Sequence, residues 1–551
     1  MKKRWYWSVV ALLLVAALLL PGCESFAEYN LMAILRKGLE RAAPKDAFSE
    51  MEYTRPDLDA YQRLVDESCQ LAATSRSVDQ MLDQTWEIYA AYDTFYTMKN
   101  LADIRYSLDL SDPFYQEEFN YCSVQSAVVD EGLDTYYRAL AKSPIVKELE
   151  DSYFDEGFFA GYGEDTPTVW NEAFSKSLEE ESTDISAFYT QMQELREGAP
   201  GQSLSAAEAE QLGELFVDLI RTRRQIAEAA GYDSYEDFAW DWYYSRDFTP
   251  AQAEAYVAEI AEKLAPMYRS MSQSRFWLTA YNGTYGQAQC EAYLSSAAEQ
   301  MGGLAQTAWD EMQQRQLYDI APGLHKYEGS FEIYLTDFQA PFVFVNPYGD
   351  VTDLLSFAHE FGHFVNDYAC GGSYASTDVA EFFSQGMEYL SLCYAQRPTT
   401  QDVELVTRLK MADSLSVYVE QAAYYSFERQ AYALPDEELS VESLRALYEA
   451  TGRRYGFDTP GWDTMEWVSI THFYTSPFYV ISYVVSNDAA FQLYQLEQEE
   501  AGAGLVRYEE LVQTDEDVSF LTFLEDSGLE SPFAPGRLDR VAELLEARVP
   551  Q

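Results

Sequence analysis

The segment that decides the fold reads Pro341-Phe-Val-Phe-Val345, then Asn-Pro-Tyr-Gly-Asp350 and, after eight further residues, His359-Glu-Phe-Gly-His363. Aromatic and β-branched residues at 341–345 predict a strand, and the proline, tyrosine and glycine that follow predict a turn. Apolar residues then recur with helical spacing over residues 350–367. The segment therefore predicts a small sheet that leads directly into a helix.

Helix signals dominate the rest of the chain. Ser205-Ala-Ala-Glu208 has the pattern of a capping box, and the helix that it opens is predicted to end near Gly231. Thr249-Pro-Ala-Gln252 combines a capping residue, a proline at the first helical position and a glutamine at the third. These signals favour a mainly helical protein.

The predicted helix carries two histidines four residues apart. His359 and His363 therefore lie on one face and can bind a single zinc ion through neutral imidazole nitrogens. Glu360 lies toward the open side of such an ion, where it can take a proton from water. The alternative is a pair of buried histidines that only pack. It is disfavoured because the 551 residues include only four histidines, the other two being His325 and His472.

A catalytic zinc site normally has three protein ligands and one open position. Gly371 and Gly372 are predicted to end the first helix, and a second helix is predicted from about Asp378. Two acids on one face of that second helix, Glu381 and Glu388, are candidate ligands if a helical hairpin brings them back to the histidines. Each has a structural alternative, because Glu381 could complete a capping box with Asp378 and Glu388 could be a solvated surface charge.

With these residues, the sequence resembles the M3 family of zinc metallopeptidases, in particular the oligoendopeptidase F group. The family pattern is HExGH followed by a glutamate in a segment of the form E-x-x-S-[QT], which here is Glu381-Phe-Phe-Ser-Gln385. The resemblance implies that Glu381 is the third zinc ligand and that Glu388 orients a histidine. It also implies a mainly α fold, a large multi-helix zincin with a small β-sheet beside the HExxH helix and a deep substrate channel.

A further match follows about a hundred residues downstream. The stretch His472-Phe-Tyr-Thr-Ser-Pro-Phe-Tyr479-Val-Ile-Ser-Tyr483 resembles the family's His-aromatic segment. In that family these side chains bind substrate and stabilise the oxyanion, so the resemblance implies catalytic roles for His472, Tyr479 and Tyr483, with Tyr474 a weaker candidate. A tyrosine-rich core helix is the alternative, since the chain has 43 tyrosines.

The resemblance extends over about residues 90–500 and includes Ala230-Gly-Tyr-Asp-Ser-Tyr-Glu-Asp-Phe238. One departure is Asn366, which stands where many members carry a further histidine that is not a metal ligand. The expected organisation is a signal peptide, a tether with the first helices, an N-terminal helical lobe and a catalytic zincin lobe: residues 1–22, 23–90, 91–230 and 231–551.

The N-terminus has the pattern of an export signal. Lys2, Lys3 and Arg4 precede an apolar run over residues 5–20, which is short for a membrane-spanning helix. Leu20-Pro-Gly-Cys23 then resembles the lipobox of bacterial lipoproteins. We therefore expect lipidation at Cys23 and an extracytoplasmic protein anchored by lipid to the bacterial cell membrane. An ordinary cleaved signal peptide and an uncleaved anchor remain alternatives.

Composition limits the classes of partner. The chain has 92 Asp and Glu against 37 Lys and Arg, a formal charge of −55, which argues against nucleic acid. Because 47% of residues are hydrophobic and 15% aromatic, a large folded core is expected despite this charge. His325 belongs to no motif and is predicted to be an ordinary loop residue.

The expected activity is hydrolysis of internal bonds in short peptides, with one Zn²⁺ bound by His359, His363 and Glu381 and with Glu360 as general base. The strand at residues 343–345 is expected to pair with extended substrate backbone. Two rivals remain: a peptide-binding surface lipoprotein with little or no catalytic activity, and a zinc hydrolase that acts on something other than a peptide.

Overall fold

The computed structural model describes residues 46–154, 157–163, 168–198, 204–277, 285–372, 376–395, 400–512 and 518–549. The predicted signal peptide at residues 1–22 and the predicted lipidation site Cys23 lie outside them, so both stay predictions. The chain forms two compact units, one with Pro56–Phe95 and Val128–Thr168, the other with Ala47–Arg55, Tyr96–Ala127 and Val169–Gln551. The lobes expected from the sequence resemblance stay predictions too.

The first unit is a small helical assembly joined by tyrosines. Two of its helices, α4 and α5, also contribute residues to the second unit; the elements are α3 (Leu58–Thr74), α4 (Val78–Leu108), α5 (Pro113–Ala141), α6 (Val146–Ser152) and η2 (Phe158–Tyr162). Tyr61 of α3 donates a hydrogen bond to the Val129 carbonyl oxygen of α5 at 2.8 Å. The hydroxyls of Thr85 and Tyr136, 2.8 Å apart, connect α4 to α5.

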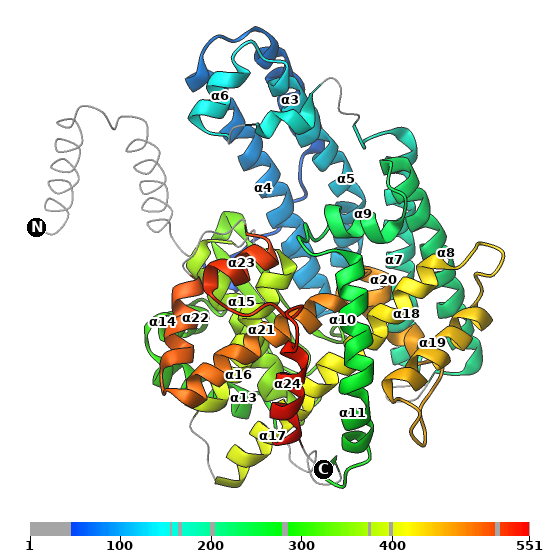
Figure 1. Ribbon diagram of the computed structural model, residues 1–551. Helices are drawn as coiled ribbons and strands as arrows, with labels where there is room; N and C mark the ends of the chain where they lie inside the picture. Colours follow the sequence, from blue (N-terminus) through cyan, green and yellow to red (C-terminus); the bar gives the residue numbers. More distant parts are fainter. Residues whose placement is uncertain are drawn as a thin grey trace, which may run out of the picture. The chain divides into compact units, whose positions relative to one another are not determined.

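The second unit contains the motifs and is mainly helical, as predicted (Figure 1). Its elements are η1 (Phe48–Glu50), α7 (Glu172–Gly198), α8 (Ala206–Ala230), α9 (Tyr235–Trp242), α10 (Pro250–Lys263), α11 (Ala265–Ser272), α13 (Gln287–Met301), α14 (Gly303–Arg315), β1 (Tyr318–Asp319), β2 (Ser330–Leu335), η3 (Thr336–Phe338), β3 (Ala340–Val345), α15 (Thr352–Cys370), α16 (Thr377–Tyr394), α17 (Thr400–Ser416), η4 (Val417–Gln421), α18 (Ala422–Ala433), α19 (Val441–Tyr455), η5 (Glu466–Ser469), α20 (Thr471–Thr475), α21 (Val480–Glu499), α22 (Ala503–Val512), α23 (Phe520–Ser527) and α24 (Arg537–Glu546).

Helix ends follow the signals in the sequence. The Ser205 side chain accepts a hydrogen bond from the Glu208 backbone N–H, and α8 ends at Gly231, whose φ of 87° suits glycine. The Thr249 side chain accepts from the Gln252 N–H at the start of α10, which begins with proline. Both predicted helix starts are therefore confirmed.

The small sheet has three strands in the order β1-β3-β2. The central strand β3 pairs parallel with β1, at Tyr318↔Val343, and antiparallel with β2, at Phe331↔Phe344. Both edges of β3 are thus occupied at Val343 and Phe344, and the prediction that residues 343–345 pair with substrate is wrong. Among the described strands, β1 and β2 each pair with β3 on one side only, and β2 is the longer of the two, with six residues against two.

The turn before α15 is organised by Asp353 in the first turn of that helix. Its carboxylate accepts hydrogen bonds from the backbone N–H groups of Tyr348 and Gly349 at 2.9 and 2.7 Å. The helix then runs to Cys370 and ends at Gly371 with φ 81°, as the two glycines predicted. The strand, turn and helix of the opening motif are therefore confirmed.

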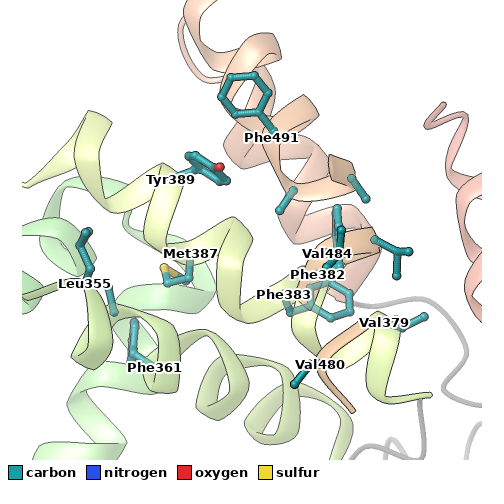
Figure 2. Packing of buried hydrophobic residues seen from close by; sticks show 14 of the residues in the cluster. Leu355, Phe361, Val379, Phe382, Phe383, Met387, Tyr389, Val480, Val484 and Phe491 are labelled. Atoms are coloured by element: carbon teal, nitrogen blue, oxygen red, sulfur yellow. The ribbon is translucent and has the colours of Figure 1, made fainter. Parts of the chain in front are cut away.

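Three helices form the core around the motif. Leu355 and Phe361 of α15, Met387 of α16 and Val484 of α21 belong to one buried hydrophobic cluster (Figure 2). The α15–α16 contact depends on Gly362, because a Cβ there would lie 2.6 Å from the Phe383 carbonyl oxygen and 2.6 Å from Ser384 Cα. The glycine of HExGH therefore allows the backbones of the two helices to meet.

None of the helices in the described residues is both long and apolar enough to cross a membrane.

Candidate metal centre

The α15–α16 hairpin brings three potential ligands together. One donor atom from each of His359, His363 and Glu381 lies within 4.8 Å of the others. The Nε2 atom of His359 is 3.3 Å from Glu381 Oε2, and the Nε2 atom of His363 is 3.8 Å from Glu381 Oε1. Glu381 is 1% exposed, whereas the two imidazoles are 18% and 17% exposed. The acid is thus buried and the histidines face open space.

This donor set fits a divalent metal. Zinc accepts imidazole nitrogen and carboxylate oxygen at about 2.0–2.2 Å, so ligand atoms around one tetrahedral ion lie about 3.3 Å apart. The observed separations of 3.3 and 3.8 Å are close to that value. Two histidines and one carboxylate form a catalytic type of site, with one position left for water or substrate.

Glu388 orients the first histidine from behind. Its Oε1 atom lies 2.9 Å from His359 Nδ1, which must be the donor because an ionised carboxylate only accepts. This fixes Nε2 as the atom that faces the metal position. The other carboxylate oxygen accepts from Lys410 Nζ at 2.7 Å, and Lys410 also binds Asp413 at 2.8 Å. Although burial raises the pKa of Glu388, Lys410 and His359 hold it below its usual value.

The Glu381 carboxylate has two further partners. Ser384 Oγ donates to Oε2 at 3.0 Å, and Tyr479 Oη donates to Oε1 at 2.6 Å. Burial opposes ionisation, but His359, His363 and Tyr479 lower the pKa of Glu381 to about 2. The hydrogen bond from Ser384 to Glu381 gives a physical reason for the serine of the E-x-x-S segment. Gln385, the next residue, donates to the Tyr483 carbonyl oxygen at 3.2 Å and so connects α16 to α21.

Glu360 and the two histidines of α15 line one cleft. Glu360 is 4% exposed, and burial raises the pKa of its carboxyl to about 7, against the opposing effect of His359. A carboxyl of this kind can accept and release a proton near neutral pH.

The cleft has a volume of about 510 Å³. His472 and Tyr483 line it together with His359, Glu360 and His363, and the His472 Nε2 atom is 3.2 Å from the Tyr483 hydroxyl. Tyr479 lines it as well, but its hydroxyl is directed to Glu381. Burial lowers the pKa of His472, so the ring is neutral at neutral pH. The side chains of this segment therefore present polar groups next to the metal position.

The sequence comparisons agree with this geometry. Residues 48–160 match the Peptidase M3 N-terminal domain, and residues 306–514 match peptidase family M3. The chain contains family M3 peptidase domains and is a metallopeptidase. No curated protein matches its sequence.

Solved structures show the same fold. PZ peptidase A with an inhibitor superposes on this metallopeptidase with a TM-score of 0.80 at 18% identity, covering 91% of this chain and 98% of that one. A protein assigned as oligoendopeptidase F from Bacillus anthracis str. Ames gives 0.77 at 20% identity, with 92% and 98% covered. Oligoendopeptidase-F from Enterococcus faecium gives 0.53 at 13% identity, with 89% and 97% covered.

Most candidate residues of the metallopeptidase converge on one cleft. The structure brings His359, Glu360, His363, Glu381, His472, Tyr479 and Tyr483 together, with Glu388 directly behind. The residue at the family's variable position, Asn366, is buried and also lines the cleft.

Several alternatives for single residues are wrong. Glu381 does not complete a capping box, because α16 begins after Ser376. The Glu381 carboxylate instead lies 3.3 Å from His359 Nε2. Glu388 is 6% exposed and is no surface charge. Tyr474 is fully buried outside the cleft, where it donates to the Leu212 carbonyl oxygen at 3.0 Å. His325 is an exposed turn residue, as predicted.

Sequence reasoning missed the residues that hold the His472 segment. Arg223 of α8 is 0% exposed and donates to the Phe473 carbonyl oxygen at 2.7 Å and to that of Tyr474. Its Nε donates to Glu181 Oε1 at 2.5 Å. Arg223 and Phe473 are 250 residues apart in the chain, so no local pattern could have paired them.

Arg246 holds the next part of the same segment. It donates to the Phe478 carbonyl oxygen at 3.1 Å, to Ser482 Oγ at 2.8 Å and to Asp378 at 3.3 Å. Both oxygens of Glu428 lie 3.2 Å from the Phe478 backbone N–H. Phe478 has φ 62°, a left-handed conformation that is unfavourable for phenylalanine and that this network stabilises.

Proposed function

We propose that the chain is a zinc-dependent endopeptidase that hydrolyses internal bonds of short peptides. One observation carries the proposal: the donor atoms of His359, His363 and Glu381 lie within 4.8 Å of one another, and Glu360 lines the same cleft. Zinc is the metal that best suits two imidazoles and one carboxylate with an open position. The residues around the metal position then account for the steps of peptide-bond hydrolysis.

Bound zinc would supply Lewis acidity to the scissile carbonyl and to a water molecule. Glu360 accepts a proton from that water as the oxygen attacks the carbonyl carbon, and then delivers the proton to the leaving amine nitrogen. Glu388 keeps the His359 ring in one orientation, so the ligand set is preorganised before substrate enters.

The oxyanion that forms during attack needs donors. His472 and Tyr483 are the best candidates, because both line the cleft and neither binds the ligand carboxylate. The Tyr479 hydroxyl already donates to Glu381, so its part in oxyanion binding requires release from that carboxylate. Hydrogen bonds to developing negative charge contribute several kcal/mol in a site that excludes water.

The edge strand β2 is the proposed partner of extended substrate backbone. Ser330, Phe331, Glu332 and Ile333 of this strand line the cleft. Because strand pairing reads backbone rather than side chains, an unfolded peptide can be held without one required sequence. A cleft of about 510 Å³ admits an extended peptide and excludes a folded domain.

The export and anchoring proposals rest on the sequence alone. Leu20-Pro-Gly-Cys23 supports lipid attachment at Cys23 and an extracytoplasmic location on the bacterial cell membrane. Mass spectrometry of the mature N-terminal peptide tests this, since an unmodified Cys23 or an uncleaved leader contradicts it.

The function is tested with quenched fluorescent peptides of increasing length, together with elemental analysis of bound metal. Wild type is expected to hold about one zinc per chain and to cleave internal bonds, and a chelator should abolish cleavage. Glu360→Gln keeps side-chain size and the metal ligands, so metal content should persist while kcat falls by at least about 10³-fold. Glu442→Gln, on the exposed surface of α19, is the matched control and should be unchanged.

Two results contradict the proposal. Cleavage undiminished in Glu360→Gln excludes the proposed general base. Stoichiometric zinc without cleavage of any peptide length favours the rival zinc hydrolase that acts on other substrates.

A further inference from the structure

A second cavity of about 820 Å³ lies in the second unit and shares no lining residue with the cleft. Residues of α8, α11, η4, α18, α19 and the segment 457–469 form its walls. Ser469 lines this cavity, while Thr471 and His472 line the cleft. One short segment of chain therefore contributes to both spaces.

Four aromatic residues form a continuous wall of the second cavity. The Phe457 ring lies 5.7 Å from Tyr268, 6.3 Å from Tyr424 and 6.1 Å from Trp462 between centroids. Trp462 rests on α19 where Gly452 has no side chain, and a Cβ there would collide with the indole. Packing contacts therefore hold the four rings of this wall in place.

Two carboxylates face this wall. Glu420 accepts a hydrogen bond from Tyr268 at 2.8 Å, and Glu466 lies 3.5 Å from the Tyr448 hydroxyl. Neither carboxylate forms an ion pair within the part of the chain that the structure describes. Glu420 belongs to η4, a π-helical segment between α17 and α18, and such segments are frequent at binding sites because they redirect side chains.

The charge of the cavity is negative. Arg445 is the one basic residue among the described residues that line it, and its Nε donates to Thr464 Oγ1 at 3.1 Å. With Asp463, three carboxylates face one guanidinium, a formal difference of 1 − 3 = −2. Burial raises the pKa of Glu420 to about 7, against the opposing hydrogen bonds from Tyr268 and Ser416.

We propose that this second cavity binds a small organic cation, an ammonium group attached to an aromatic or apolar body. The rings of Tyr268, Tyr424 and Trp462 line the cavity and would attract a cation through their quadrupoles, and Glu420 and Glu466 would accept its hydrogen bonds. The volume lies within the range of pockets for small ligands. The ammonium could belong to a free amine or to the N-terminus of a peptide, because both offer the same chemistry.

Binding is measured by calorimetry on the full chain at about pH 8, where Glu420 is ionised. The probes are 2-phenylethylamine, its neutral counterpart 2-phenylethanol, and the peptide Phe-Ala-Ala with a free or an acetylated N-terminus. The amine is expected to bind at least about tenfold more tightly than the alcohol. Binding of the free but not the acetylated peptide would show that the cavity accepts a peptide N-terminus, and binding of neither peptide would limit the ligand class to free amines. Equal binding of both peptides would show that no ammonium group is recognised and would overturn the proposal.

Variants locate the binding. Glu420→Gln and Glu466→Gln each remove one charge at constant size and should weaken amine binding at least about tenfold, whereas Glu442→Gln and Glu360→Gln should not. Trp462→Leu provides an independent test of the aromatic wall, and thermal unfolding verifies that each variant folds. Equal affinity for amine and alcohol overturns the proposal. So does amine binding that survives Glu420→Gln and Glu466→Gln but is lost in Glu360→Gln, since the ligand then lies in the cleft.

Discussion

The α15–α16 hairpin and the His472–Tyr483 segment line the same cleft, but different interactions hold them in place. Close helix packing at Gly362 positions the hairpin. Two of its candidate ligands, His363 and Glu381, are only 18 positions apart in the chain. The His472 segment is positioned by buried charges from far away in the sequence, chiefly Arg223 and Arg246. Packing thus places the candidate ligands, and buried polar contacts place the candidate oxyanion donors.

This difference implies two separable kinds of damage. Disturbing the hairpin moves the candidate ligands relative to one another, so metal binding and activity should fall together. Disturbing the buried charges moves His472 and the tyrosines but leaves the ligands in place, so activity should fall while metal content stays constant. The predictions below test that separation.

Among the changes that test this separation, the largest effect is expected for Gly362→Ala. The new Cβ would lie 2.6 Å from backbone atoms of Phe383 and Ser384, which cannot rotate away as a side chain could. We expect a loss of about 1–3 kcal/mol in the free energy of unfolding and, because α16 must shift, at least about 100-fold in kcat/KM. Denaturant unfolding, bound metal and peptide cleavage measure these quantities.

Gly161→Ala is the matched control, since a Cβ at Gly161 meets no atom within 4 Å. It should leave all three measurements within error of wild type. Full metal content and activity in Gly362→Ala would mean that the helices tolerate separation, and the account of the hairpin would be wrong.

An intermediate effect is expected for Arg246→Lys. Lysine keeps a positive charge, but its single nitrogen cannot replace both Nε, which donates to Asp378, and Nη2, which donates to the Phe478 carbonyl oxygen and to Ser482. We expect kcat to fall about tenfold with little change in KM, because the donors shift while the metal ligands and β2 do not. Steady-state kinetics and elemental analysis measure the two sides of this comparison.

Arg224→Lys is the matched control. Arg224 also donates to backbone carbonyl oxygens, those of Tyr432 and Leu434, but it lies outside the cleft. Loss of metal in Arg246→Lys, or an equal loss of kcat in Arg224→Lys, would show that the two regions are not separable.

The same difference explains how far the sequence could be read. The strand, the turn and the helix with its histidine pair were predicted because helical periodicity and glycine positions are local signals. Glu388 was assigned behind a histidine through the family resemblance, and it lies 2.9 Å from His359. Lys410, the partner of Glu388, was not found, because a buried lysine carries no local pattern.

The sheet shows a second limit. Residues 341–345 were recognised as a strand, but a strand's composition does not reveal whether its edges are free. The order β1-β3-β2 places this strand in the middle, so β2 became the candidate for substrate pairing. The prediction for Tyr474 was wrong for a related reason. Tyr474 stands two residues after His472, as a site residue could, but its ring packs on that of Phe188 with 3.9 Å between the centroids.

A smaller effect concerns pH. Burial raises the pKa of Glu428 to about 8 from an ordinary 4.5, against the opposing effects of the Phe478 N–H, Arg223 and Arg246. The folded protein therefore holds this proton more tightly than the unfolded chain. Its stabilising contribution is complete below pH 4.5 and is lost as pH rises to about 8, at up to about 1.4 kcal/mol per pH unit.

Glu428→Gln removes this titration at constant size. The free energy of unfolding of wild type relative to the variant should decrease from pH 5 to pH 8, measured by denaturant unfolding at each pH, while other groups cancel in the difference. Parallel curves would show that Glu428 is ionised throughout, with the arginines of the network as its counter-ions.

The smallest effect concerns the charge of the substrate. Asp103, Glu332, Glu360, Asp367 and Glu381 line the cleft, and no lysine or arginine does so among the described residues. Burial raises the pKa of Asp103 and, together with Asp367, that of Glu332, so only part of this charge acts on a peptide.

We expect kcat/KM for a lysine-containing peptide to fall about two- to fivefold between low and high salt, and less for a neutral peptide of equal length. Asp367→Asn should reduce this salt dependence, and Asp310→Asn on the exposed side of α14 should not. These acids belong to α4, β2, α15 and α16, and none belongs to the His472–Tyr483 segment. We therefore assign the attraction of positively charged substrates to the side of the cleft that carries the candidate metal ligands. Equal salt dependence in the Asp367→Asn and Asp310→Asn variants would refute that assignment.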